Sequence, residues 1–354
     1  MNSKSQNPFK KLMEVKGMGG ALTAFVGLII IYVAFGLIND TVFSSQNVLN
    51  LLRSMSKYLL IGIGQSFVLI TGNIDLSIGS QVGMSAMISA TLMVAGVHPI
   101  LAILITLACC LVIGAINGIL VGKFQLPPFI ATLGTMFAAR GVAYMVNGNR
   151  NTDAITATLD KTTADNFQNF FYYGKTLGVY NTFWIAIALF VVFFFVLSKT
   201  RSGRHIYAIG SNVEAAKLSG VNVVATTTKA YLVSAFLGGV VGLILCAQAG
   251  MGNMEAGNMY EMYGVAAGVI GGVSPLGGTG ILLGTLAGAA VWQTLENGLN
   301  MIGAQVGIQR LVIGVIVVFA VLLDVVVRNG NAGKGKQKKE QIKSLSKYKE
   351  EKVS

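Results

Sequence analysis

The sequence predicts an all-α polytopic membrane protein with about ten transmembrane helices, interrupted in places by glycine-rich segments. Of its 354 residues, 53% are hydrophobic and only 11% are charged, whereas a soluble domain carries roughly 25% charged residues. The apolar residues gather in runs long enough to cross a bilayer of ~30 Å. The 44 glycines are typical of helices that pack closely in lipid. Nearly the whole chain is therefore predicted to lie in the membrane.

Three parts follow one another along the chain: a leader of residues 1–19, a transmembrane domain of residues 20–328 and a basic tail of residues 329–354. The first span, Gly20–Ile38, follows a polar and basic leader, so we interpret it as an anchor; a cleaved signal peptide is the alternative. The other predicted spans are Lys57–Gly72, Ser77–Gly96, His98–Val121, Pro127–Asn147, Asn181–Ser198, Lys229–Gly250, Met262–Gly277, Gly280–Ile302 and Gly307–Arg328.

Positive charge orients these spans, because Lys and Arg concentrate in the cytosolic loops of membrane proteins. If the N-terminus lies inside, 19 of the 26 Lys and Arg residues fall in the leader, at Lys123, in the central loop or in the tail, all on the inner side. Ten crossings then place both termini in the cytosol. The long polar segment Gly148–Tyr180 is predicted to lie outside.

The first interruption lies in residues 68–83 (VLITGNIDLSIGSQVG), where the hydrophobic run stops at Gly72 and passes Asn73, Asp75 and Ser77 before it resumes. Irregular backbone at membrane depth persists only where it is buried in protein or lines a watery cavity. An ionisable side chain there is a functional candidate. The alternative is an aspartate at the cytosolic end of a helix, where it is merely solvated.

A second glycine-rich interruption, residues 265–289, includes Ser274 and follows the first by about 200 residues. Gly72 matches Gly272 at that offset, which suggests an internal repeat. Interrupted segments in two halves of a chain indicate a transport path. Close helix packing alone also explains many glycines in such segments.

Arg140 lies inside the predicted span Pro127–Asn147, about 20 Å from its start at ~1.5 Å per residue. A guanidinium at that depth needs a carboxylate or a carbonyl partner, and Asp75 and Glu296 are the candidate carboxylates. We interpret Arg140 and Glu296 as buried charges, and expect Arg140 to be structurally paired rather than in contact with a substrate.

No enzyme chemistry is indicated by the remaining residues. The three cysteines lie in apolar runs and are typical of packing residues. No Cys and His cluster has metal-ligand spacing, so neither a metal site nor a catalytic residue is expected. Residues 330–337 approach a phosphate-binding loop but carry Gln337 where Ser or Thr is needed. Any ATP must therefore be bound by another chain, and no cofactor or nucleic acid is expected on this one.

The central polar segment, Lys199–Lys229, concentrates positive charge between two apolar spans. Ser211 and Glu214 fit a capping box, and Gly220 stands where a left-handed residue ends a helix. The pattern predicts one short helix over residues 213–219. Glu214 is either a capping residue on a surface helix or part of a docking site, and both interpretations can hold together.

Three short segments resemble known transport proteins. Residues 214–220 are similar to the EAA loop of ABC-importer permeases. Residues 201–222, 71–79 (TGNIDLSIG) and 127–136 (PPFIATLGTM, followed by Arg140-Gly141) are similar to segments of the ribose/galactose/xylose-type permease family. Asn73 replaces a glycine of that family, and the chain lacks the Ile-x-Leu-Pro continuation of the longer EAA signature, so it departs from maltose-type permeases.

The resemblance implies a permease subunit, present in two copies, of an ATP-driven monosaccharide importer in a bacterial cytoplasmic membrane. The implied partners are a cytosolic ATP-binding subunit that holds ATP and magnesium, an extracytoplasmic sugar-binding protein, a second permease copy and the lipid bilayer. The residues expected to couple to the ATPase are Arg204, Ser211, Glu214, Ala215, Ala216 and Gly220. Those expected along the substrate pathway are Asn73, Asp75, Ser77, Thr132 and Ser274.

Two other classes of function stay open at the level of the sequence. An ion-coupled secondary transporter would use Asp75, Glu296 and Arg140 as a coupling network and would need no ATPase. An enzyme within the membrane lacks any supporting nucleophile–base pair. The capped helix in a basic cytosolic loop favours the ATP-driven importer, because an ion-driven carrier has no need of one.

Overall fold

The computed structural model describes residues 18–312, 314, 315, 318 and 322. The leader up to residue 17, the phosphate-loop near miss, the basic tail and most of the last predicted span lie outside the described residues. The chain divides into two units, residues 1–305 and 306–354. In the second unit, residues 306–312 are helical.

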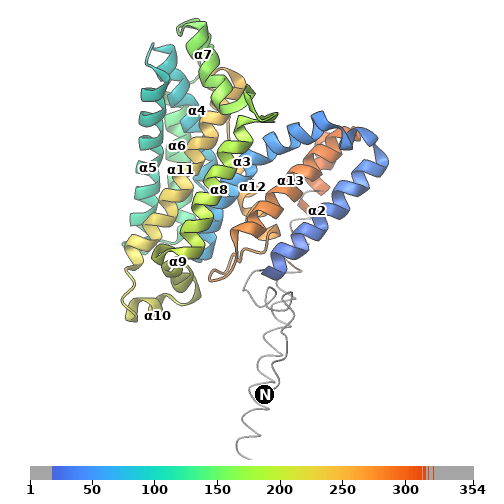
Figure 1. Cartoon of the computed structure of the whole chain (residues 1–354). Helices are drawn as coiled ribbons and strands as arrows, with labels where there is room; N and C mark the ends of the chain where they lie inside the picture. The colour runs from blue at the N-terminus through green and yellow to red at the C-terminus, as the bar shows by residue number, and fades with distance from the viewer. Residues whose placement is uncertain (1–17, 313, 316–317, 319–321, 323–354) are drawn as a thin grey trace, which may run out of the picture. The chain divides into compact units, whose positions relative to one another are not determined.

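The first unit is a bundle of helices (Figure 1). Each of the first nine predicted spans overlaps a helix. These helices are α2 (Met18–Ile38), α3 (Ser45–Ile70), α4 (Ile78–Val94), α5 (Pro99–Gly122), α6 (Pro128–Met145), α8 (Asn181–Lys199), α11 (Val223–Ala249), α12 (Tyr260–Ile270) and α13 (Leu282–Met301).

Four of these helices, α2, α5, α8 and α11, are long and apolar enough to cross a membrane. Together with the helical architecture, they confirm the prediction of an all-α membrane protein. The number of ten crossings and the orientation of the termini stay predictions.

Helices α3 and α12 both differ in length from the prediction. Helix α3 begins at Ser45, because the Ser44 side chain caps it by accepting a hydrogen bond from the Asn47 amide. Helix α12 has only 11 residues and rises about 16 Å at ~1.5 Å per residue, roughly half the ~30 Å of a bilayer core. It therefore does not cross a bilayer by itself.

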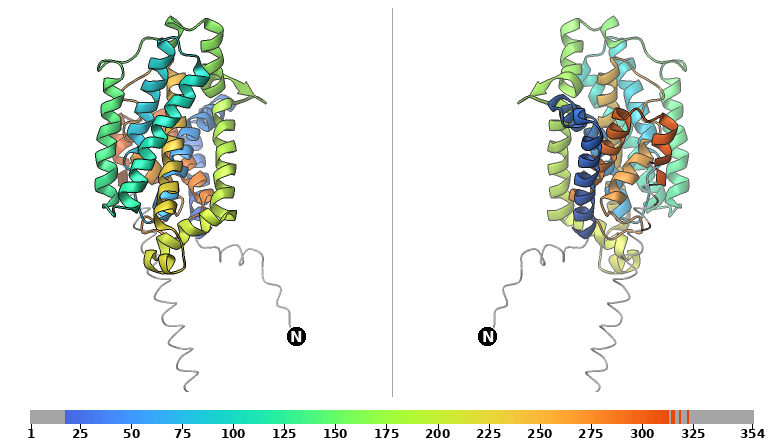
Figure 2. Two further views of the ribbon diagram at one scale, coloured as in Figure 1. Left: turned by 90° about the vertical axis from the view of Figure 1, so that its left-hand side faces the viewer. Right: turned by 90° about the vertical axis from the view of Figure 1, so that its right-hand side faces the viewer.

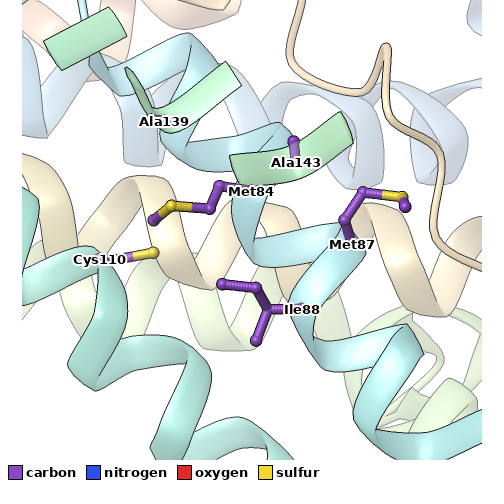
Figure 3. Close-up of a cluster of buried hydrophobic side chains, with 6 residues drawn as sticks. All are labelled: Met84, Met87, Ile88, Cys110, Ala139 and Ala143. Carbon is purple, nitrogen blue, oxygen red and sulfur yellow. The ribbon is translucent and has the colours of Figure 1, made fainter. Parts of the chain in front are cut away.

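Helix α11 lies at the centre of the bundle, packed against α3, α4 and α5. Helix α4 packs on its other side against α6. A cluster of buried side chains joins α4, α5 and α6 (Figure 3), and its members are Met84, Met87, Ile88, Cys110, Ala139 and Ala143. This cluster fixes α6 against α4, the two helices that border the cavity described below.

The two long polar segments are both structured, and they lie at opposite ends of the bundle (Figures 1 and 2). One end carries α9 (Arg201–Ser211) and α10 (Val213–Leu218). The other end carries η1 (Asp40–Phe43), η2 (Ile155–Ala157), α7 (Lys161–Gln168), η3 (Asn169–Tyr173) and an antiparallel hairpin of β1 (Lys175–Thr176) and β2 (Val179–Tyr180). The separation agrees with the predicted placement of these segments on opposite sides of the membrane.

Candidate functional site

The first interruption is a sharp end of α3 followed by a buried turn. Gly72 has a left-handed backbone, with φ of +80°, and its amide donates to the Leu69 carbonyl at 2.8 Å. The Asn73 amide donates to the Val68 carbonyl at 3.3 Å. This pair of bonds is a Schellman motif, which glycine favours because it has no Cβ.

Asp75 is fully buried in this turn. Its Oδ1 accepts from the Ser77 amide at 2.9 Å and from the Ser77 hydroxyl at 2.6 Å, and its Oδ2 accepts from the Ser234 hydroxyl of α11 at 2.7 Å. The alternative of a solvated aspartate is therefore wrong. A buried carboxylate persists only with such donors, so Asp75 ties the turn to α11.

The hydrogen bonds continue from Ser77 into two further helices. Ser77 Oγ accepts from Asn117 Nδ2 of α5 at 2.8 Å, and Asn117 Oδ1 accepts from Thr135 Oγ1 of α6 at 2.6 Å. Of the other predicted pathway residues, Thr132 is buried and donates to the carbonyl of Pro128 in its own helix. Asn73 is half-buried and donates to Thr71. The network holds the first interruption against α5, α6 and α11.

The second interruption repeats the first one. Gly272 has φ of +83°, its amide donates to the Val269 carbonyl at 2.8 Å, and the Val273 amide donates to the Gly268 carbonyl at 2.9 Å. Ser274 is buried, and its Oγ accepts from the Leu276 amide at 3.1 Å. The same motif thus ends α3 and α12 at positions about 200 residues apart, which supports the predicted repeat.

Backbone contacts join the two interruptions, and α9 covers the junction. The Gly278 amide donates to the Ile70 carbonyl at 2.9 Å. Gly210 of α9 lies so close that an added Cβ would overlap the Ile70 carbonyl oxygen and come within 2.5 Å of the Gly278 nitrogen. The Tyr207 hydroxyl of α9 donates to the Gly280 carbonyl at 2.6 Å. Helix α9 therefore touches both interruptions at once.

Sequence reasoning missed α9, although signals for it were present. The Thr200 side chain caps it by accepting from the Gly203 amide at 3.3 Å. Gly203, Ile206 and Ile209 are buried at near-helical spacing. Glycines at two of its positions lowered the apparent helix propensity. Their actual role is close approach to neighbouring backbone.

The predicted capping box at the start of α10 is wrong. Asn212, not Ser211, is the N-cap, and its Oδ1 accepts from the Ala215 amide at 2.9 Å. Ser211 is the last residue of α9, and its hydroxyl bonds the Tyr207 carbonyl at 2.8 Å. Ser211 belongs to the preceding helix and cannot begin the next one. Glu214 is exposed on the first turn of α10.

The predicted end of α10 is confirmed. Gly220 has φ of +80°, its amide donates to the Lys217 carbonyl at 3.0 Å, and the Val221 amide donates to the Ala216 carbonyl at 3.0 Å. The same Schellman motif as at the interruptions therefore closes α10.

One residue expected to couple to the ATPase, Ala216, is not exposed. Ala216 is buried by its own chain, with 4% of its surface exposed, whereas Leu218 is 88% exposed and Val213 is 43% exposed. Ala215 is exposed, as is Arg204 on α9. The exposed apolar side chains of α10 are therefore Val213, Ala215 and Leu218, without Ala216.

Arg140 is half-buried and donates through Nη1 to two backbone carbonyls, those of Met254 at 2.7 Å and Ala256 at 2.9 Å. Its partners are thus carbonyls and not the candidate carboxylates. Asp75 is bonded to hydroxyls as described above, and half-buried Glu296 accepts from the Tyr58 hydroxyl at 2.8 Å. The three charged residues of the predicted ion-coupling network have separate partners.

A cavity of about 250 Å³ lies beside Arg140. It is lined by α4, by the C-terminal half of α6, by the segment that leads into α12 and by the first turn of α12. Its polar side chains are Ser80, Arg140, Tyr144, Glu255, Asn258 and Glu261. Over the described part of the chain, no group of three or more His, Cys, Asp or Glu side chains could hold a metal ion. The cavity is therefore lined by hydrogen-bond donors and acceptors, and by both positively and negatively charged side chains.

Comparison with known proteins gives a family match over residues 47–321, to the family described as branched-chain amino acid transport system / permease component. The ribose import permease protein of Bacillus subtilis (strain 168) is 36% identical over 316 residues, which cover 89% of this chain and 96% of the relative. The galactose/methyl galactoside import permease protein of Escherichia coli (strain K12) is 34% identical, over 92% of this chain and 98% of the relative. The D-allose transport system permease protein of the same strain is 33% identical, over 85% and 90%. No solved structure matches.

Proposed function

Because this chain belongs to the family of transport-system permease components, within the group of sugar ABC-importer permeases, we propose that it forms the membrane pathway of an ATP-driven monosaccharide importer. It is a multi-pass protein of the bacterial cytoplasmic membrane. Membership of an ABC importer system implies an ATPase and a solute-binding protein as partners. We propose further that the chain acts as two copies, that ATP and magnesium are bound by the ATPase, and that this chain is a transport subunit and not an enzyme.

The observation that carries the ATP-driven mechanism is the position of α9 and α10. Helix α10 leaves Val213 and Leu218 exposed to solvent, and exposed apolar side chains among charged ones are typical of a docking surface. In this proposal, the ATPase binds that surface, with Glu214 and Arg204 at its rim. Helix α10 is closed at both ends by capping bonds, so it moves as a short rigid piece.

Movement of α10 reaches the transport path through α9. Only Asn212 separates the two helices, and α9 touches the first interruption at Ile70 and the second at Gly278 and Gly280. Packed backbones of this kind shift between discrete arrangements and do not deform continuously. A displacement of α9 therefore changes both interruptions together, which is the requirement for alternating access.

The interruptions themselves flank the proposed path. Asp75, Ser77 and Thr132 are fully buried and bonded within the protein. In this proposal they do not contact the solute but hold the backbone that lines the path in position. Half-buried Asn73 and the turn around Ser274 lie closer to the point where the two halves meet. The ion-coupled alternative is disfavoured because Asp75, Glu296 and Arg140 have separate partners.

The experiment that tests the proposal is uptake by the reconstituted importer. The permease is co-expressed with a sugar-importer ATPase and a solute-binding protein of the same bacterium, purified with them and inserted into liposomes. We expect uptake of radiolabelled D-ribose or D-galactose that requires ATP on the α9–α10 side and is abolished by vanadate. L-leucine is the comparison solute, because the family description names branched-chain amino acids. Uptake driven by a sodium or proton gradient without ATP would contradict the proposal.

A further inference from the structure

The cavity beside Arg140 adjoins the C-terminal part of the first interruption through Ser80 and has no role in the coupling mechanism above. It lies toward the end of the bundle opposite α9 and α10. The segment that borders it is joined to the loop after α6 by the bond from the Thr152 amide to the Gly252 carbonyl at 3.1 Å and the bond from the Ile155 amide to the Gly250 carbonyl at 2.9 Å. The loop continues into α7, which marks that end (Figure 1). A solute arriving from the side predicted to be extracytoplasmic would meet this cavity early.

Two glycines of α4 make the space for the charged side chains. A Cβ at Gly79 would overlap the Glu261 carboxylate, and a Cβ at Gly83 would come within 2.5 Å of Arg140 Nη1. Residues four apart lie on the same face of a helix. The Glu261 carboxylate and the Arg140 guanidinium thus contact one face of α4 about one turn apart. Buried Ser80 follows Gly79 in the same helix.

The polar side chains are arranged to bind hydroxyl groups. Arg140 is anchored by two backbone carbonyls, and the Tyr144 hydroxyl is hydrogen-bonded to Glu255. Glu255 and Glu261 are acceptors, whereas the Asn258 amide both donates and accepts. A set that offers donors and acceptors side by side matches a polyhydroxylated solute, because each hydroxyl both donates and accepts.

The remaining wall is apolar. Met136 and Phe137 of α6 line it, and Phe137 leaves 67% of its surface exposed. A pyranose or furanose ring has an apolar C–H face that packs on such a wall. The cavity volume of about 250 Å³ equals that of roughly eight waters at ~30 Å³ each, which is enough for a monosaccharide with a few of its waters.

We propose that this cavity is a monosaccharide-binding subsite at the outer part of the transport path. The proposal rests on the proposed function, since it assigns a sugar as the solute. An anionic ligand is disfavoured by the two carboxylates. A bare cation is disfavoured by the Arg140 guanidinium between them and by the apolar wall. A neutral polyol satisfies every one of these groups.

The first test is protection of an introduced cysteine. Asn258→Cys is placed in a Cys109→Ala background, because Cys109 is the half-buried cysteine whereas Cys110 and Cys246 are buried. The complete importer is labelled with a small water-soluble methanethiosulfonate reagent. We expect the transported sugar, at millimolar concentration, to slow labelling about threefold or more. Thr162→Cys on exposed α7 is the matched control and should label at the same rate with and without sugar.

Three outcomes of that test would overturn the proposal. One is an unchanged labelling rate at position 258 in the presence of sugar. Another is equal slowing by sugar at position 162. A third is slowing by sodium chloride relative to choline chloride without an effect of sugar, which would assign the cavity to a cation.

The second test uses substitutions that keep the shape of the cavity. Tyr144→Phe and Glu261→Gln each weaken hydrogen bonding, and loss of one such bond typically changes affinity about fivefold. At a low sugar concentration, we expect the rate of ATP-dependent uptake to fall by between about three- and tenfold. The rate of ATP hydrolysis should stay within about twofold of the wild-type rate. Tyr173→Phe is the control, because its hydroxyl bonds the Gln248 carbonyl at 2.8 Å outside the cavity.

The two proposals fail in different ways. If wild-type protein imports sugar with ATP and the two cavity variants import it equally well, the subsite is wrong and the proposed function stands. If Tyr173→Phe loses as much uptake as the cavity variants, the effect is not specific and the subsite is also wrong. If the wild-type importer shows no ATP-dependent sugar uptake, the proposed function and the subsite fall together.

Discussion

Single buried side chains hold the first interruption in place, and Asp75 accepts three of their hydrogen bonds. Its carboxylate receives two hydrogen bonds from Ser77 and one from Ser234. All three groups donate, so a side chain at position 75 must accept at both of its terminal atoms. The chain from Ser77 to Asn117 and Thr135 then extends this requirement to α5 and α6.

Asp75→Asn replaces one acceptor oxygen with an amide that can only donate. We expect the variant to lose about 1–3 kcal/mol of stability, the usual cost of an unsatisfied buried polar group, and to show a lower melting temperature in a detergent thermal-shift assay. Ser198→Ala is the control, since the Ser198 hydroxyl is exposed and bonds only its own helix. An unchanged melting temperature together with lost uptake would instead indicate direct contact between Asp75 and the solute.

At the scale of elements, α9 is the link between α10 and the interrupted segments. Its Gly210 is required by contact and not by backbone conformation, because the neighbouring Ile70 carbonyl leaves no room for a Cβ. The Tyr207 hydroxyl adds a hydrogen bond to Gly280. The helix is thus joined to both halves of the repeat within one turn.

Gly210→Ala should separate α9 from the interruptions. We expect a permease that still inserts and still co-purifies with its ATPase, but with sugar uptake reduced at least about tenfold while ATP hydrolysis continues. Gly27→Ala in α2 is the matched control, because a Cβ at Gly27 would meet no atom within 4 Å. Normal coupling in the Gly210 variant would refute the assigned role of α9.

The docking surface of α10 is predicted to depend on its exposed apolar side chains. Leu218→Asp places a charge at a position whose side chain is 88% exposed, so the permease should fold while ATPase co-purification and uptake are lost.

Gly220→Val strains a left-handed position and should also abolish both ATPase co-purification and uptake. Ala216→Asp is not an equivalent probe, because Ala216 is buried in its own chain and its substitution destabilises the loop itself. Retained ATPase binding by Leu218→Asp would move the docking site elsewhere.

At the scale of the whole molecule, the segment with α9 and α10 and the segment with α7 lie at opposite ends of the bundle (Figure 2). The charge distribution of the sequence predicts that the first end is cytosolic. The short α12 and the two interruptions lie between these ends. The cavity and the α9 junction are therefore separated along the proposed direction of transport.

Cysteine labelling of intact cells tests this arrangement. We expect an impermeant maleimide to label Asn151→Cys and to leave Lys217→Cys unlabelled until the membrane is opened. Both positions are exposed; the first precedes α7 and the second belongs to α10, and these helices lie at opposite ends of the bundle (Figure 1). Labelling of position 217 from outside would contradict the predicted orientation.

The sequence by itself determined the features that depend on local chemistry. Long apolar runs mark the helices, because burying backbone polar groups in lipid requires a helix whatever lies beside it. Gly72, Gly220 and Gly272 mark the helix ends, because a left-handed residue is required within a few positions of each end. The predicted N-cap of α10 was nevertheless wrong. Ser211 and Asn212 are both suitable N-cap residues, and the end of α9 at Ser211 leaves Asn212 as the cap.

The tertiary structure alone decided which distant groups meet. The Gly210 contact joins residues on either side of it in sequence, Ile70 and Gly278. The cavity brings Glu261 against Gly79. The sequence left both a carboxylate and a carbonyl partner open for Arg140, and the structure shows the carbonyls of residues 254 and 256. Such partners are chosen by how closely helices pack, and packing depends on the summed shapes of many side chains. A hydropathy pattern or a short motif records which face of a helix is apolar, but it does not record which helix lies against that face.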